Sequence, residues 1–117
     1  MSMRTLQCSL VIAVIALLAT PALAADAAAG KATFDTLCAT CHGTSGKGDG
    51  PTAAALNPPA RNFTDKVWQA KVTDDHIKKV ITQGGAANGL SPMMPPFGHL
   101  KGAELDNLVA YIRSFGK

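Results

Sequence analysis

The sequence predicts an all-α domain of about three to five helices joined by long loops. Apolar residues recur at helical spacing, most clearly over 103–115, and no segment alternates polar and apolar residues as a half-buried strand would. Glycine and proline gather in two irregular segments, 43–59 and 86–100. Irregular segments of that length are unusual in a small domain, so we expect them to wrap around a large apolar group that the chain does not encode.

The first 24 residues have the pattern of a secretory signal peptide. Arg4 supplies a positive charge, residues 10–19 form an apolar run, and Ala22 and Ala24 make the A-x-A pattern of a signal peptidase site. A retained membrane anchor is the alternative, but the run is about half of the ~20 residues that a spanning helix needs. We therefore expect cleavage after Ala24, which also removes Cys8, and one mature domain, 25–117, in the periplasm.

The mature chain is short and carries little net charge. Removing Arg4 with the leader leaves ten of the 11 Lys and Arg residues against all 8 Asp and Glu residues. A net side-chain charge of +2 is too small to indicate nucleic-acid binding. Once the leader is gone we expect no stable membrane insertion. A domain of this size gains much from a disulfide, a metal or a cofactor, because its own core is small.

The first half of the mature chain carries three predicted helical segments. Alanine, lysine and leucine favour a helix over 27–40, in which Gly30 and Phe34 share one face because they lie four residues apart. One helical turn is expected at 52–56, inside the glycine-rich segment. A short helix is expected at 64–69.

A fourth helix follows, with a clear start and end. Thr73 precedes two aspartates, which is typical of an N-cap followed by acids at the positive end of the helix dipole. The helix should end at Gly84-Gly85. Its expected buried face is Ile77, Val80 and Ile81.

The last helix is expected from about Ala103 to Phe115. Gly116 follows it as the expected C-cap. The side chains at helical spacing that should face the core are Leu105, Leu108, Val109, Ile112 and Phe115.

The strongest motif is Cys38-Ala39-Thr40-Cys41-His42, which is C-x-x-C-H, the pattern of covalent haem attachment. Two thiols three residues apart at a helix end lie on one side and can meet the two vinyl groups of one haem edge, while the adjacent imidazole turns toward the iron. The alternatives are a disulfide, a redox dithiol and half of a zinc site. A redox dithiol of the thioredoxin kind lies in a βαβ unit, which this sequence does not predict. A zinc site would need two further ligands, and only His76 and His99 could join His42, at irregular spacings along the chain.

A second iron ligand is expected in Pro92-Met93-Met94-Pro95-Pro96, because a stiff loop holds a weak thioether ligand at low entropic cost. Pro95 restricts Met94 to an extended conformation, so Met93 should point to the opposite side. One of the two methionines is then a core or loop side chain rather than a ligand.

These motifs together resemble the small bacterial monohaem class I cytochromes c, over essentially all of 25–117. The resemblance implies a compact fold around one haem c per chain, with His42 and Met94 as axial ligands. It also implies a crossing of the first and last helices through Gly30 and Phe34 against Leu108 and Tyr111. Three further haem contacts follow from it: the carbonyl of Pro51 as acceptor for the His42 Nδ1–H, and Arg61 and Trp68 as partners of the haem propionates.

The function implied is that of a periplasmic carrier of single electrons between larger redox proteins, and not that of an enzyme. With both axial positions filled by the protein, no substrate reaches the iron. A dedicated subunit of one oxidoreductase is one alternative. A haem enzyme with a displaceable sixth ligand is another, but a peroxidase would need a distal His and Arg in place of the methionine loop. The donor and acceptor are not identified, and a monomer is expected. The eight mature lysines would suit an acidic partner face, but a solvated surface is the stronger interpretation of them.

Overall fold

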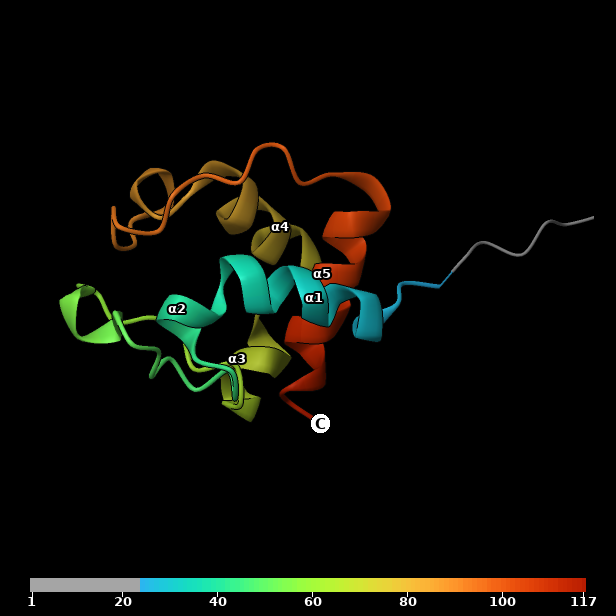
Figure 1. Ribbon diagram of the computed structural model, residues 1–117, viewed down its shortest axis with the longest axis horizontal. Coiled ribbons are helices and arrows are strands. Elements are labelled where there is room, and N and C mark those ends of the chain that lie inside the picture. The colour runs from blue at the N-terminus through green and yellow to red at the C-terminus, as the bar shows by residue number, and fades with distance from the viewer. Residues whose placement is uncertain (1–23) are drawn as a thin grey trace, which may run out of the picture.

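The computed structural model describes residues 24–117, and it contains five α-helices and two short 3-10 helices (Figure 1). No strand occurs in this range, so the predicted all-α class is confirmed. The predicted signal peptide at 1–24 lies outside the described residues but for its last position, Ala24. Within 24–117 no helix has both the length and the apolar character needed to cross a membrane.

The predicted first helix is divided in two by Cys38. Helix α1 runs over Ala27–Leu37, and Asp26 caps it by accepting hydrogen bonds from the backbone N–H groups of Ala28 and Ala29 at 2.9 and 3.2 Å. Cys38, at φ −118°, is the C-cap of α1 and also the N-cap of α2, Ala39–His42. The prediction of one helix over 27–40 was therefore wrong at its end, where a new single turn carries the motif.

The middle of the chain follows the prediction closely. The turn expected at 52–56 is a 3-10 helix over Ala53–Ala55, and the short helix is α3, Lys66–Lys71, capped by Asp65. Helix α4 spans Asp74–Gln83, and the Thr73 hydroxyl accepts a hydrogen bond from the His76 N–H at 3.1 Å, as predicted. Gly84, at φ 82°, ends α4.

Small differences remain toward the C-terminus. A second 3-10 helix, Ala86–Asn88, lies in a segment predicted to be irregular. Helix α5 spans Gly102–Ser114, and its C-cap is Phe115 rather than the predicted Gly116. Val80 is only half-buried, whereas Ile77 and Ile81 are buried as expected.

Helices α1 and α5 cross in the most extensive helix contact of the described residues (Figure 1). Gly30 permits the crossing, because a Cβ at this position would overlap the backbone carbonyl of Asn107. One turn further along α1, Phe34 is fully buried and meets the ring of Tyr111 edge-on at 5.2 Å between centroids. Leu108 is fully buried beside them, so the predicted crossing is confirmed.

We predict that Gly30→Ala destabilises the folded protein by about 1–3 kcal/mol, because the added methyl group meets rigid backbone atoms of α5. Denaturant unfolding followed by circular dichroism measures the change. Gly98→Ala is the matched control, since its Cβ would make only ordinary contact, at 3.7 Å from the Thr82 carbonyl oxygen. Equal stability of the two variants would contradict this account of the crossing.

Candidate functional site

A cavity of about 460 Å³ lies between α2 with the segment that follows it and α4 with the loop that follows it. Its walls are mostly apolar. Those on the α4 side include Ile77, Ile81 and Phe97, and those on the α2 side include Leu56 and Phe63. The two irregular segments of the sequence therefore line one space, as expected from their length and composition.

The C-x-x-C-H motif forms part of this wall. Cys38, Cys41 and His42 all line the cavity, and the two cysteines are free thiols with half-buried side chains. Burial, and secondly the nearby Cys41 sulfur, raises the pKa of Cys38 to about 12. The Cys41 Sγ lies 3.2 Å from the Thr52 hydroxyl. Two thiols three residues apart are thus presented to one apolar space, as the motif predicts.

The imidazole of His42 is held from two directions. Its Nδ1 lies 3.1 Å from the carbonyl oxygen of Arg61, and a carbonyl can only accept, so Nδ1 carries the proton. The ring of Phe63 stacks on the imidazole with centroids 4.4 Å apart and an interplanar angle of 16°. Burial lowers the pKa of His42 from its ordinary value, and the hydrogen bond to Arg61 partly opposes this. The ring is therefore neutral at pH 7, with Nε2 unprotonated.

The predicted role of Pro51 was wrong. The hydrogen bond assigned to the Pro51 carbonyl is made by the carbonyl of Arg61, and Pro51 is exposed and does not line the cavity. The cause is the path of the glycine-rich segment, which folds back on α2. Gly50 N–H donates to the Cys41 carbonyl at 3.0 Å and Thr52 N–H to the Thr40 carbonyl at 3.1 Å, so the chain around Pro51 runs along the backbone of α2.

The two adjacent methionines lie in different surroundings. Met94 lines the cavity and packs against the core, whereas the side chain of Met93 is 53% exposed. The two side chains differ in surroundings as predicted, but the cause is not the predicted extended segment, because residues 91–94 form a turn closed by the Met94 N–H and the Ser91 carbonyl. Two backbone hydrogen bonds fix Met94: its N–H donates to the Ser91 carbonyl at 3.1 Å, and its carbonyl accepts from Gly85 N–H at 2.9 Å.

Gly84 and Gly85 have a role that the sequence interpretation missed. Besides ending α4, they let the Met94 loop approach closely, because a Cβ on Gly84 would lie 2.8 Å from the Pro96 nitrogen and one on Gly85 would overlap the Ser91 carbonyl. A pair of glycines is more than a helix end requires. The second glycine, seven residues before the proline-rich loop that begins at Pro92, was the available signal.

Arg61 and Trp68 both line the cavity. The Arg61 guanidinium carbon lies 5.6 Å from the centroid of the Trp68 ring, which is a cation–π contact. His76 also reaches the cavity wall, from the first turn of α4, although its side chain is exposed. His99 does not line the cavity and lies against the Phe97 ring at 6.3 Å between centroids.

The donor atoms in the wall suit haem and do not suit zinc. The cavity gathers two thiols, one unprotonated imidazole nitrogen and one thioether within apolar walls. Over 24–117, no three His, Cys, Asp or Glu side chains come together as a metal-binding group, so the zinc alternative lacks its further ligands. A large apolar cofactor fixed through both thiols fits these residues.

Comparisons with known proteins agree with this chemistry. Residues 27–116 match the family model described as Cytochrome c. The chain is 35% identical to a cytochrome c6 of a Picosynechococcus species over 107 residues, covering 87% of this chain and 84% of the relative. It is 32% identical to the Cbb3-type cytochrome c oxidase subunit FixP of Bradyrhizobium diazoefficiens, covering 78% of this chain but 28% of that protein. It is also similar to the solved structure of the c-type cytochrome KustC0563, with a TM-score of 0.59 and 33% identity over 75% of this chain and 98% of that one.

We predict that the fold requires covalent attachment through both cysteines, because the apolar cavity between the loops would otherwise collapse or fill with water. Cys38→Ser/Cys41→Ser, expressed with the export and haem-maturation machinery, should carry no covalent pigment and should accumulate poorly or unfold. Thr40→Ser, an exposed position in the same motif, is the control and should behave as wild type. A pigment-free double variant with normal helical circular dichroism would refute this.

Proposed function

This chain belongs to the cytochrome c family, and from that premise we propose that it is a periplasmic carrier of single electrons with one haem c between His42 and Met94. Membership makes it an electron-transfer protein with covalently bound haem c, and not an enzyme. The observation that carries the finer proposal is that the C-x-x-C-H turn and Met94 line one apolar cavity. Haem c supplies an iron that takes up and releases one electron.

The residues of α2 would hold the cofactor from one side. The sulfurs of Cys38 and Cys41 would form its two thioethers, and the short helix that carries them keeps both sulfurs at the cavity wall. His42 would offer Nε2 to the iron, because Nδ1 is already bonded to the Arg61 carbonyl. Such a bond fixes the imidazole plane and raises the basicity of the ligating nitrogen.

The loop after α4 would hold the cofactor from the other side. The thioether of Met94 is a soft, weak ligand, and the backbone bonds to Ser91 and Gly85 hold it without help from the metal. His42 and Met94 together would leave no position at the iron for a substrate. Arg61 and Trp68, joined by their cation–π contact at the cavity wall, are the proposed partners of the propionates.

The location in the periplasm and the free, monomeric state are part of the proposal. Export is supported by the leader pattern at 1–24. The first described helix begins at Ala27 with its cap at Asp26, so cleavage after Ala24 would leave the folded part whole. The electron donor and acceptor are proposed to be larger redox proteins of that compartment.

A dedicated subunit of one oxidoreductase is the second candidate function. The similarity to FixP favours it, because that relative is named as an oxidase subunit. The chain spans 28% of FixP and 84% of the cytochrome c6 relative.

We predict that Met94→Ala abolishes the weak near-infrared sulfur-to-iron charge-transfer band. The potential should also fall by about 0.1 V or more, within the span of about 0.8 V that axial ligands cover. Met93→Ala is the matched control, since this side chain is exposed, and it should keep the band with a small shift in potential. The reverse pattern would reassign the ligand to Met93, and absence of the band from the wild type itself would point to His76 or His99.

We predict that a periplasmic extract of the cells contains the protein and that it is a monomer there. Gel filtration of native extract, followed at the haem absorbance, should give one peak at the size of a small single domain. Intact mass should equal residues 25–117 plus one haem. Elution with a large complex would favour the subunit function, and a mass that retains residues 1–24 would contradict the leader.

A further inference from the structure

Segment 61–63 makes two contacts with His42 that bear on the orientation of its imidazole. The Arg61 carbonyl oxygen lies 3.1 Å from Nδ1, and the Phe63 ring stacks on the imidazole at 4.4 Å and 16°. One contact sets the direction of the N–H, and the other sets the plane of the ring. Any shift of this segment must therefore change the hydrogen bond, the ring plane or both.

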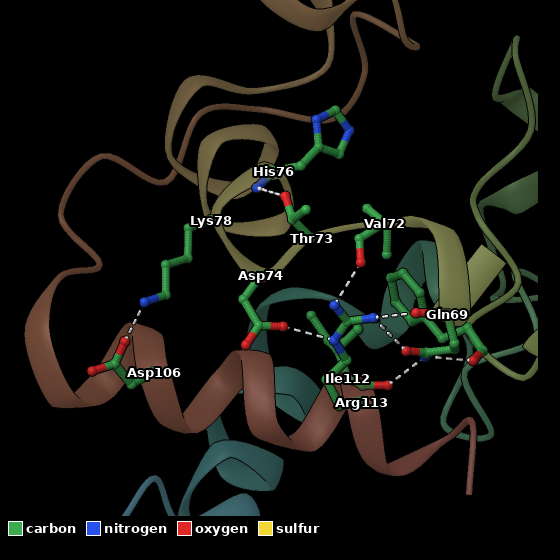
Figure 2. Close-up of polar contacts among 10 residues, drawn as sticks. Gln69, Val72, Thr73, Asp74, His76, Lys78, Asp106, Ile112 and Arg113 are labelled. Atoms are coloured by element: carbon green, nitrogen blue, oxygen red, sulfur yellow. Dashed lines mark hydrogen bonds and ion pairs between the residues drawn. The ribbon is translucent and has the colours of Figure 1, made fainter.

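The backbone of Phe63 is anchored at both of its polar groups. Its N–H donates to the Gly46 carbonyl at 2.7 Å, and its carbonyl accepts from Gln69 Nε2 at 2.8 Å. The same amide nitrogen donates to the Ile112 carbonyl in the last turn of α5 at 3.0 Å. Both donors of the Gln69 amide are thus used, and they tie segment 61–63 to α5 (Figure 2).

Arg113 holds the other end of that amide. Its Nη1 donates to Gln69 Oε1 at 3.1 Å and to the Gln69 backbone carbonyl at 2.7 Å. Its Nη2 donates to the Val72 carbonyl, and its Nε to Asp74 Oδ1, each at 2.7 Å (Figure 2). With Oε1 facing a guanidinium, which can only donate, the amide nitrogen must face Phe63 and Ile112. The guanidinium therefore fixes which way the Gln69 amide points.

We propose that Gln69, oriented by Arg113, is a positioning residue that sets the hydrogen bond and ring plane of His42 through segment 61–63. The proposal rests on the proposed function in one respect, namely that His42 ligates the iron. A strong Nδ1–H bond makes the imidazole a richer donor, which favours the oxidised state of a bound iron. Loosening segment 61–63 weakens that bond and should raise the reduction potential.

Gln69→Glu separates positioning from general stability. A carboxylate keeps the acceptor for Arg113 and so keeps the tie between α3 and α5, but it loses both donors and turns an oxygen toward the Phe63 carbonyl. In the holoprotein at pH 7 we expect a higher potential than wild type. We also expect solvent exchange of the His42 Nδ1 proton, measured by nuclear magnetic resonance, to be faster on the order of tenfold.

Lys78→Gln is the matched control. It removes the ion pair between Lys78 Nζ and Asp106 Oδ1, 2.6 Å apart, which joins α4 to α5 without contacting segment 61–63 (Figure 2). This variant should leave the potential and the exchange rate unchanged. A second variant, Arg113→Lys, keeps the charge but loses the planar fork, and it should shift both readouts in the same direction as Gln69→Glu.

Unchanged potential and exchange rate in a folded Gln69→Glu holoprotein would overturn the proposal. If Gln69→Glu does not accumulate as a folded holoprotein, unchanged potential and exchange rate in Arg113→Lys would overturn the proposal. Equal shifts in Lys78→Gln would also overturn it, because the effect would then be one of general stability. Failure of the proposed function looks different: the wild type itself would lack a haem spectrum or a Nδ1 proton signal from an iron-bound histidine.

Discussion

The close crossing of α1 and α5 is the contact on which the site depends. Gly30 lets the two helix backbones touch, and the same residue of α5, Asn107, also accepts a hydrogen bond from Asp26 N–H through its side chain at 2.7 Å. The N-terminal end of α1 is therefore held against α5 by two contacts, and Asn107 makes both of them. Phe34 then buries its ring one turn later, and four residues after it the chain reaches Cys38. The direction of α1 at the crossing therefore determines where α2 presents the motif.

The two long irregular segments each contain one short 3-10 helix, and hydrogen bonds to helix ends order the rest of them. The last carbonyls of a helix have no partner within it. In α2, the carbonyls of Thr40, Cys41 and His42 accept from Thr52, Gly50 and Gly48, so the first segment closes on the helix end. In α4, the Ile81 carbonyl accepts from Phe97 N–H at 2.9 Å. Each loop thus satisfies backbone groups that would otherwise need water, and together the loops leave the cavity between them.

Features with a local signature were predictable from the sequence, and features made by backbone carbonyls were not. Thr73 as a cap, the Gly30–Phe34 pair and the C-x-x-C-H motif each depend on side-chain types at fixed spacing, which a sequence displays. The acceptor for the His42 Nδ1–H is a backbone carbonyl, and every residue has one. Choosing the right residue would require knowing how the glycine-rich segment is aligned against His42, and no sequence pattern defines that alignment. Pro51 was the wrong choice for that reason. Gln69 and Arg113 were missed because their partners are again carbonyls, 6 and 44 positions away along the chain for two of the bonds.

The two sides of the cavity are held by different means, and the difference matches the chemistry of the two proposed ligands. His42 lies on a helix, its Nδ1 and its ring face are both engaged, and those contacts lead through Gln69 to α5. Met94 lies on a loop fixed by two backbone hydrogen bonds and by the two glycines against which it packs. Imidazole is the stronger ligand, and its strength depends on the hydrogen bond at Nδ1 and on the orientation of the ring. A rigid support that fixes both can therefore set the strength of the ligand. A thioether is weak in any orientation and needs chiefly to be kept near, which a short stiff loop achieves with few contacts. The polar network is accordingly concentrated behind His42, the proposed ligand whose properties it can change.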